Sequence, residues 1–191
     1  MSVFSKTKIL QRLELEVSKA ASLVITPFDE NLLDADSVDL RLGTHFLFPK
    51  VTAKRVVEVG NSRPGEDFSV HVPHGEKLIL PAHETVLGVT LEFIKLPFDV
   101  SGQILTKSSV ARAFMVIETA PWIHPNYRGC LTLEIANVSN SAIELWSGMP
   151  IGQLILFGID LPEKSSTLSG SYVGPIYPEA PGRYKRHPHT D

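Results

Sequence analysis

The sequence contains a single cysteine, Cys130, and this scarcity excludes two kinds of structural support. No disulfide can form within the chain, and one thiol cannot build a cysteine-rich zinc site. A reducing compartment is therefore the simpler expectation, and we expect the protein to be cytoplasmic. The N-terminal stretch MSVFSKTKIL agrees with this, because it lacks the long apolar core of a signal peptide.

Long hydrophobic runs and an excess of basic charge are also lacking. No stretch approaches the run of about 18 apolar residues that a membrane-spanning helix requires. The chain has 18 Lys and Arg against 21 Asp and Glu, which gives a net charge of −3. A protein that binds duplex nucleic acid without sequence preference normally carries a basic excess. We therefore expect neither a membrane nor a nucleic acid as a partner, while a local cationic pocket for a small anion stays possible.

Several common catalytic motifs are missing as well. The sequence has no G-x-x-x-x-G-K-[ST] phosphate loop and no G-x-G-x-x-G after a strand. The H-x-E and P-C-x-x-C motifs of the zinc nucleobase deaminases are also absent. Any chemistry on a nucleotide must therefore use residues outside these patterns.

The apolar residues that are present predict one mainly β domain. A chain of 191 residues is long enough for one domain with a full core. Near the N-terminus, Ser5 can cap a helix over residues 6–18, because apolar residues follow at helical spacing: Ile9, Leu10, Leu13 and Val17. In the segment VDLRLGTHFLF (38–48), apolar and polar residues alternate as in a half-buried strand, with one face formed by Val38, Leu40 and Leu42 and the other by Asp39 and Arg41.

The rest of the chain divides into three parts. Residues 51–76 are weakly patterned and predict a surface loop or an irregular hairpin. From residue 77 onward, short apolar segments separated by Gly, Pro, Asn and Ser indicate an all-β barrel or a jelly-roll-like sandwich. Residues 161–191 are rich in proline and predict an extended tail, so we place the domain at 1–160.

One carboxylate stands out in the segment GCLTLEIANV. Strand alternation places Leu131, Leu133 and Ile135 on one face, and Glu134 among small residues on the other. Glu134 either belongs to a solvated outer face, as most charged residues do, or lines a pocket. In a pocket, partial burial would raise its pKa toward that of a useful general base.

The segment TKSSVARAF (106–114) sets two cations and two hydroxyls within six positions. Such residues are common in solvated turns. Alternatively, Ser108, Ser109 and neighbouring backbone N–H groups could hold phosphate oxygens, while Lys107 and Arg112 donate charge-assisted hydrogen bonds. His124, between Ile123 and Pro125 in the next loop, is more simply explained as a packed or surface histidine.

Four segments, taken in order, resemble the dCTP deaminase family of the dUTPase-like superfamily: SVDLRLG (37–43), KSSVAR (107–112), TAPWIHPNYRGCLTLEIAN (119–137) and SGMPIGQLILF (147–157). The match runs in register over roughly residues 5–157. The resemblance implies a mainly β fold, a distorted jelly-roll or β-barrel of the dUTPase-like type with a short N-terminal helix. It also implies a homotrimer with active sites between subunits and a C-terminal tail that folds over the bound nucleotide.

The resemblance further implies hydrolytic deamination of dCTP to dUTP and ammonia without zinc, with Mg²⁺ held on the triphosphate. By position, Glu134 would be the general base, while Ser108 and Arg112 would hold the attacking water and the pyrimidine. Lys107 and Ser109 would contact phosphate oxygens. The other implied nucleotide contacts are Ala120, His124, Thr132, Leu133, Gln153, Tyr177 and Arg183.

The sequence departs from the family in places. His124 stands where the family often has Asp, at the position expected to meet the sugar, and Lys107 stands where Arg is frequent. Tail contacts from Tyr177 and Arg183 match least well, because no glutamine follows Tyr184.

Two alternatives to a simple deaminase stay open. One is a dUTP pyrophosphatase, alone or combined with deamination; against pyrophosphatase activity alone, the glycine-rich C-terminal phosphate motif of trimeric dUTPases is absent. The other is a non-catalytic barrel that binds nucleotide as a sensor.

Overall fold

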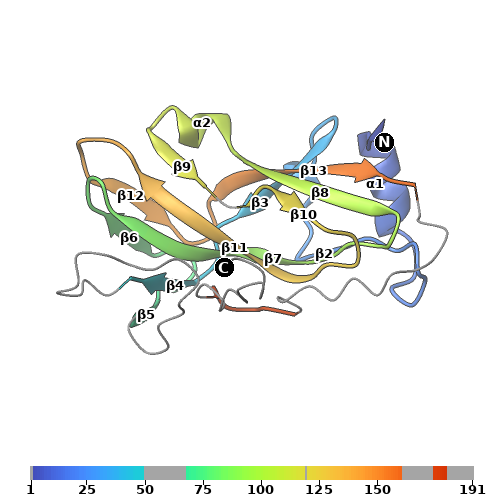
Figure 1. Ribbon diagram of the computed structural model, residues 1–191, viewed down its shortest axis with the longest axis horizontal. Helices are drawn as coiled ribbons and strands as arrows, with labels where there is room; N and C mark the ends of the chain where they lie inside the picture. Colours follow the sequence, from blue (N-terminus) through green and yellow to red (C-terminus); the bar gives the residue numbers. More distant parts are fainter. Residues whose placement is uncertain (1, 50–67, 119, 161–173, 180–191) are drawn as a thin grey trace, which may run out of the picture.

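Two antiparallel β-sheets and a two-stranded ribbon form the protein in a computed structural model, which describes residues 2–49, 68–118, 120–160 and 174–179 (Figure 1). The first sheet is built around β13 (Pro150–Gly158), which pairs with β8 (Val100–Thr106) along one edge. The other edge of β13 pairs with β3 (Ser37–Arg41) and, further along, with β1 (Ser2–Val3). The short strand β10 (Trp122–Ile123) pairs with β8.

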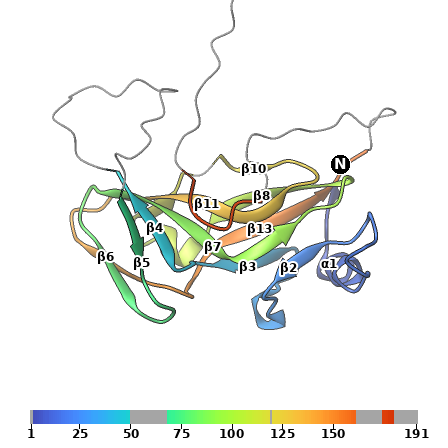
Figure 2. The same cartoon turned by 90° about the horizontal axis from the view of Figure 1, so that it is seen from below.

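The second sheet is centred on β7 (Thr85–Lys95) and β11 (Arg128–Asn137). Its strand order is β5–β4–β7–β11–β9, and β2 pairs with the end of β7. The bounds of the other members are β2 (Val24–Thr26), β4 (His45–Phe48), β5 (Phe68–His71) and β9 (Met115–Ile117). A separate ribbon pairs β6 (Lys77–Leu80) with β12 (Ile143–Trp146). Figure 2 shows these layers from a perpendicular direction.

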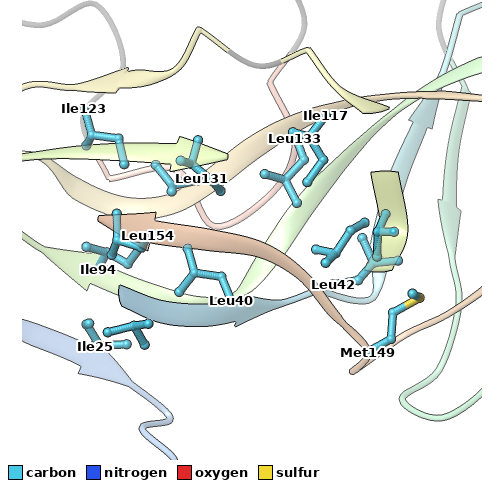
Figure 3. Close-up of a cluster of buried hydrophobic side chains, with 14 of the residues drawn as sticks. Ile25, Leu40, Leu42, Ile94, Ile117, Ile123, Leu131, Leu133, Met149 and Leu154 are labelled. Atoms are coloured by element: carbon cyan, nitrogen blue, oxygen red, sulfur yellow. The ribbon is translucent and has the colours of Figure 1, made fainter. Parts of the chain in front are cut away.

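One hydrophobic core lies between the two sheets (Figure 3). Leu40 and Leu154 enter it from the first sheet, and Ile94 and Leu133 enter it from the second; all four are fully buried. Complete burial of one such side chain contributes about 1.5–3 kcal/mol. The core therefore fixes how the outward-facing residues of β3, β13, β7 and β11 are placed.

The helices are short. They are α1 (Lys6–Leu13), the 3-10 turn η1 (Glu30–Leu32) and α2 (Ser108–Ala111). Ser5 caps α1 as predicted, since its hydroxyl accepts a hydrogen bond from the Lys8 N–H at 3.4 Å. The expected extension of this helix to residue 18 is wrong. The carbonyl of Arg12, which another turn would use, accepts the Leu23 N–H at 3.1 Å instead, and Val17 is 66% exposed.

The strand predictions are confirmed, with one division. Residues 38–48 form two strands, because the chain bends at Gly43 where it passes close to β7: a Cβ at Gly43 would lie 2.8 Å from the carbonyl oxygen of Val89. Val38, Leu40 and Leu42 are buried as expected. The apolar segments from residue 77 onward all contain strands.

Two sequence predictions concern residues that lie largely outside the described part of the chain. Most of the expected loop at 51–76 lies outside the described residues, although residues 68–71 form β5. The domain boundary at 160 stays a prediction, because residues 161–173 and 180–191 also lie outside them. Among the helices that the structure describes, none has the length and apolar character needed to cross a membrane.

Candidate active site

The polar segment that follows β8 forms an ordered turn. The Lys107 N–H donates to the Ile151 carbonyl of β13 at 3.0 Å, and the Lys107 carbonyl accepts the N–H groups of Val110 and Ala111. Val110 is 6% exposed and anchors the turn in the core. Ser108, Ser109 and Arg112 are exposed. The predicted cluster is therefore a single helical turn, α2, that presents its hydroxyls and one cation to solvent.

Glu134 lies on the outer face of the second sheet. Leu133 and Ile135 on either side of it are fully buried, so strand alternation turns the Glu134 side chain away from the core, where it is exposed. Thr132 shares that face and is partly buried. The predicted alternation along β11 is confirmed, although Cys130 and Ala136 on the outer face are buried too, at 8% and 6% exposed.

The α2 turn and Glu134 occupy different places on one chain. The turn leads into β9, whose first residue, Met115, pairs with Asn137 at the end of β11. Glu134 lies three residues back along β11, which corresponds to about 10 Å at the usual rise of a strand. Figure 1 shows α2 next to β9, which is the edge strand of the second sheet. The chain thus groups Lys107 to Arg112 on one turn and Thr132 to Glu134 on one strand.

Lys107 has a partner that sequence analysis did not assign. Its ammonium forms an ion pair with the carboxylate of Asp39 on β3, and the two side chains are only 28% and 15% exposed. Gln153 lies between the two strands that carry them, since it pairs with Asp39 on one side and with Leu105 on the other. Strand alternation had placed Asp39 on a polar face, but nothing in the sequence linked it to Lys107.

A pocket of about 380 Å³ opens between α2 and the ribbon strand β12. Two predicted site residues, Lys107 and Ser109, line it, and the ring of Trp146, 45% exposed, lies among its apolar lining. The remaining lining residues are Val110, Ala113, Met115, Ile143, Glu144, Leu145, Met149 and Pro150. A volume of this size is within the range of small-molecule sites. Ser108, Arg112 and Glu134 do not line it, so the pocket brings together only Lys107 and Ser109 of the predicted site.

The loop before β11 carries two more predicted residues. Ala120 precedes β10 and His124 follows it, and both side chains are exposed. The His124 carbonyl accepts the Tyr127 N–H at 3.3 Å. Tyr127 in turn donates its hydroxyl to the Cys130 carbonyl at 2.8 Å. The loop is thereby tied to the start of β11.

Residues 174–179 of the tail lie across the start of β11. The Gly174 N–H donates to the Arg128 carbonyl, and the Cys130 N–H donates to the Pro175 carbonyl, each at 2.7 Å. Further along, the Glu179 N–H donates to the Thr132 hydroxyl at 3.2 Å. This part of the tail therefore covers the strand that carries Thr132, Leu133 and Glu134.

The close approach of the tail depends on a glycine. Gly129 has a φ of +146°, and a Cβ there would lie 2.5 Å from Cδ of Pro175. The tail residue Tyr177 packs its ring edge-on against His45 of β4, with ring centres 4.7 Å apart. Of the two predicted tail contacts, Tyr177 thus lies near β11 and β4, whereas Arg183 lies outside the described residues.

Several ionisable groups around this region have altered pKa values. Burial, followed by the neighbouring His71, lowers the pKa of His45 below 6.5. Burial also raises the pKa of the Cys130 thiol, with a smaller contribution from Glu92. Within residues 2–49, 68–118, 120–160 and 174–179, no three His, Cys, Asp or Glu side chains gather closely enough to hold a metal ion.

Comparisons with known proteins identify a family whose members are similar to this chain. A family model described as dCTP deaminase-like matches residues 3–159. A protein of Corynebacterium diphtheriae named dCTP deaminase, dUMP-forming, is 36% identical over 162 residues, which make up 81% of this chain and 86% of that protein. A Rhodococcus jostii protein of the same name is 37% identical over 169 residues, 85% of this chain and 88% of that one.

The fold is also found in a solved structure. The crystal structure of a 2′-deoxycytidine 5′-triphosphate deaminase from Agrobacterium tumefaciens matches with a TM-score of 0.62 at 18% identity. The match covers 81% of this chain and 47% of that chain, so this protein spans about half its length. The expected dUTPase-like fold is confirmed. From the matched family model and from relatives aligned over most of their length, the chain belongs to the dCTP deaminase-like family.

Proposed function

We propose that this protein deaminates dCTP hydrolytically and releases dUMP. The observation that carries the proposal is its identity of 36–37% with proteins named dCTP deaminase, dUMP-forming, over more than four-fifths of the chain. The balanced reaction consumes two waters: one replaces the amino group at C4 and releases ammonia, and the other cleaves the triphosphate to dUMP and pyrophosphate. This product replaces the dUTP expected from sequence and favours the combined deaminase and pyrophosphatase.

Glu134 is the general base in this proposal. It would take a proton from water attacking C4 and deliver it to the departing amine, while Ser108 and Arg112 hold that water and the pyrimidine. A positioned carboxylate in such a role contributes about 10²–10⁴ in rate. Support comes from its place on the outer face of β11, beside Thr132 and Leu133, with the tail close by.

The two halves of the site would meet between subunits. Because α2 leads into β9 opposite Asn137, three residues along β11 from Glu134, and because Glu134 does not line the pocket beside α2, we infer that α2 of one subunit completes the site on β11 of another in a homotrimer. Lys107 and Ser109 would then contact the phosphates of a dCTP that carries Mg²⁺ as part of the substrate. No zinc enters this scheme, and a cytoplasmic location stays a prediction.

The test is a product assay with one matched variant pair. Purified protein is incubated with dCTP and Mg²⁺, and ammonia, dUTP, dUMP and pyrophosphate are resolved over time. We expect ammonia and dUMP to appear together with little dUTP. Accumulation of dUTP would show that the protein only deaminates dCTP and does not cleave the triphosphate. Binding of dCTP without release of ammonia would show that it is a non-catalytic sensor.

The variant Glu134→Gln keeps the size of the side chain and removes its basic oxygen. We expect ammonia release to fall by about 10²-fold or more, with dCTP binding largely kept. The control is Glu118→Gln, an exposed carboxylate whose backbone N–H donates to the Glu134 carbonyl at 2.8 Å. Equal losses in the two variants would remove the assigned role of Glu134.

A further inference from the structure

The ion pair between Asp39 and Lys107 spans a whole strand of the first sheet. Asp39 belongs to β3 and Lys107 follows β8, and β13 lies between these strands. The two residues are 68 positions apart in sequence. The contact is therefore made by the tertiary fold and not by local chain geometry.

Partial burial makes this pair different from a surface ion pair. The exposed pair Lys77–Glu144 has side chains 62% and 47% exposed, whereas those of Lys107 and Asp39 are 28% and 15% exposed. A lysine ammonium is strongly hydrated and carried on a flexible stem. Without the carboxylate, the Lys107 ammonium would lose its partner in a poorly solvated place, and it would turn toward water.

Lys107 and Ser109 both line the α2 pocket, whereas Asp39 does not. The backbone of Lys107 is already fixed, because its N–H is bonded to Ile151 and its carbonyl closes the α2 turn. An ammonium has three N–H donors, so one hydrogen bond to Asp39 leaves two for ligand oxygens. The side chain is thus both restrained and still able to donate.

We propose that Asp39 is a positioning residue that fixes the side chain of Lys107, a residue lining the α2 pocket, so that its ammonium is ready to meet the phosphate oxygens of the nucleotide. The inference rests on the phosphate-binding role of Lys107 in the proposed function. A long side chain that is already ordered before binding loses less conformational entropy when the ligand binds, so the affinity for the ligand is higher. The Asp39 carboxylate could instead weaken phosphate binding by neutralising the lysine charge, and in that case removal of Asp39 would tighten nucleotide binding. Positioning predicts weaker binding, so the direction of the change in affinity distinguishes the two effects.

The first test is Asp39→Asn in the full-length protein, assayed by ammonia release. We expect the KM for dCTP to rise about threefold to tenfold, the range for losing one preordered side chain, with kcat for deamination nearly unchanged because the proposed role of Lys107 is to contact phosphate oxygens and not the reacting base. Inhibition by deoxycytidine, which has no phosphates, should not change. Asp36→Asn, an exposed aspartate just before β3, is the control and should keep the wild-type KM.

A double-variant cycle separates this inference from the proposed function. Lys107→Ala should raise the KM, and adding Asp39→Asn to it should raise the KM no further, because the two residues act as one unit. A Lys107→Ala variant with wild-type KM would remove the phosphate role itself. A raised KM in Lys107→Ala together with an unchanged or lower KM in Asp39→Asn would overturn only the positioning role.

Folding is checked by urea unfolding of each variant. Should Asp39→Asn fail to fold, Asp39→Glu takes its place, since it keeps the charge and moves the carboxylate by one methylene. Positioning then predicts a KM between those of the wild type and Lys107→Ala. A KM equal to that of the wild type would count against it.

Discussion

Substitution of Gly129 by alanine tests how the tail is attached to β11. The φ of +146° is a conformation that alanine adopts only with strain, at a cost of about 1–3 kcal/mol. In addition, the new Cβ would lie 2.5 Å from Cδ and 2.9 Å from Cγ of Pro175. Because a proline ring cannot fold away, residues 174–179 must move off the strand.

The size of the effect follows from the contacts that hold this segment. Three hydrogen bonds join it to β11: Gly174 to Arg128, Cys130 to Pro175, and Glu179 to the Thr132 hydroxyl. At about 0.5–1.5 kcal/mol each, their loss amounts to about 1.5–4.5 kcal/mol. Opening of the segment should therefore become at least about tenfold more frequent.

Amide hydrogen exchange measures this opening directly. We expect the amides of Gly174 and Cys130 to exchange at least about tenfold faster in Gly129→Ala, while the core amides of β7 keep their protection. Gly75→Ala is the matched control, since Gly75 also has a positive φ, +83°, but has nothing within 4 Å of a new Cβ. Unchanged exchange at Gly174 in a folded Gly129→Ala protein would refute the reasoning.

Two further predictions concern ionisable groups. Arg41→Met leaves Glu92, 1% exposed, without the guanidinium that hydrogen-bonds its carboxylate at 2.6 Å, so the free energy of unfolding at pH 7 should fall by about 3–5 kcal/mol in urea titrations. For His45, the lowered pKa means that the unfolded chain binds its proton more readily, so stability should decrease as the pH falls below 6.5. Replacing His45 by phenylalanine, which keeps a ring against Tyr177, should remove that part of the pH dependence.

Each of these has its own control. Lys77→Met removes the cation of an exposed pair and should change the free energy of unfolding by no more than about 1 kcal/mol. A similar small change in Arg41→Met would show that Glu92 is not dependent on its partner. An unaltered pH profile in His45→Phe would show that another group is responsible.

The features that sequence predicted are those set by neighbours along the chain. Strand alternation is a local property, so the buried positions Leu131, Leu133 and Ile135 could be read directly. The end of α1 could not, because it depends on Leu23 returning to bond Arg12. For residues 38–48, the alternation predicted the buried positions correctly but not the division into two strands at Gly43.

The same distinction holds for the candidate site. Lys107 and Ser109 were grouped correctly because they are adjacent in sequence, and the structure places both on the lining of one pocket. Asp39 and Trp146 were missed as their companions, because only tertiary folding brings them to α2. No periodicity signals a contact between residues 68 positions apart.

The strand β11 has neighbours on every side. Leu133 and Ile135 fill the interior, β7 and β9 take its two edges, and Pro175 lies over its outer surface at Cys130. Mutational tolerance at the buried positions of β11 is accordingly narrow, since a replacement there must disturb packing, pairing or the overlying chain. Evolutionary drift in this lineage should instead accumulate on β5 and β6, where Phe68 and Ile79 are more than half exposed.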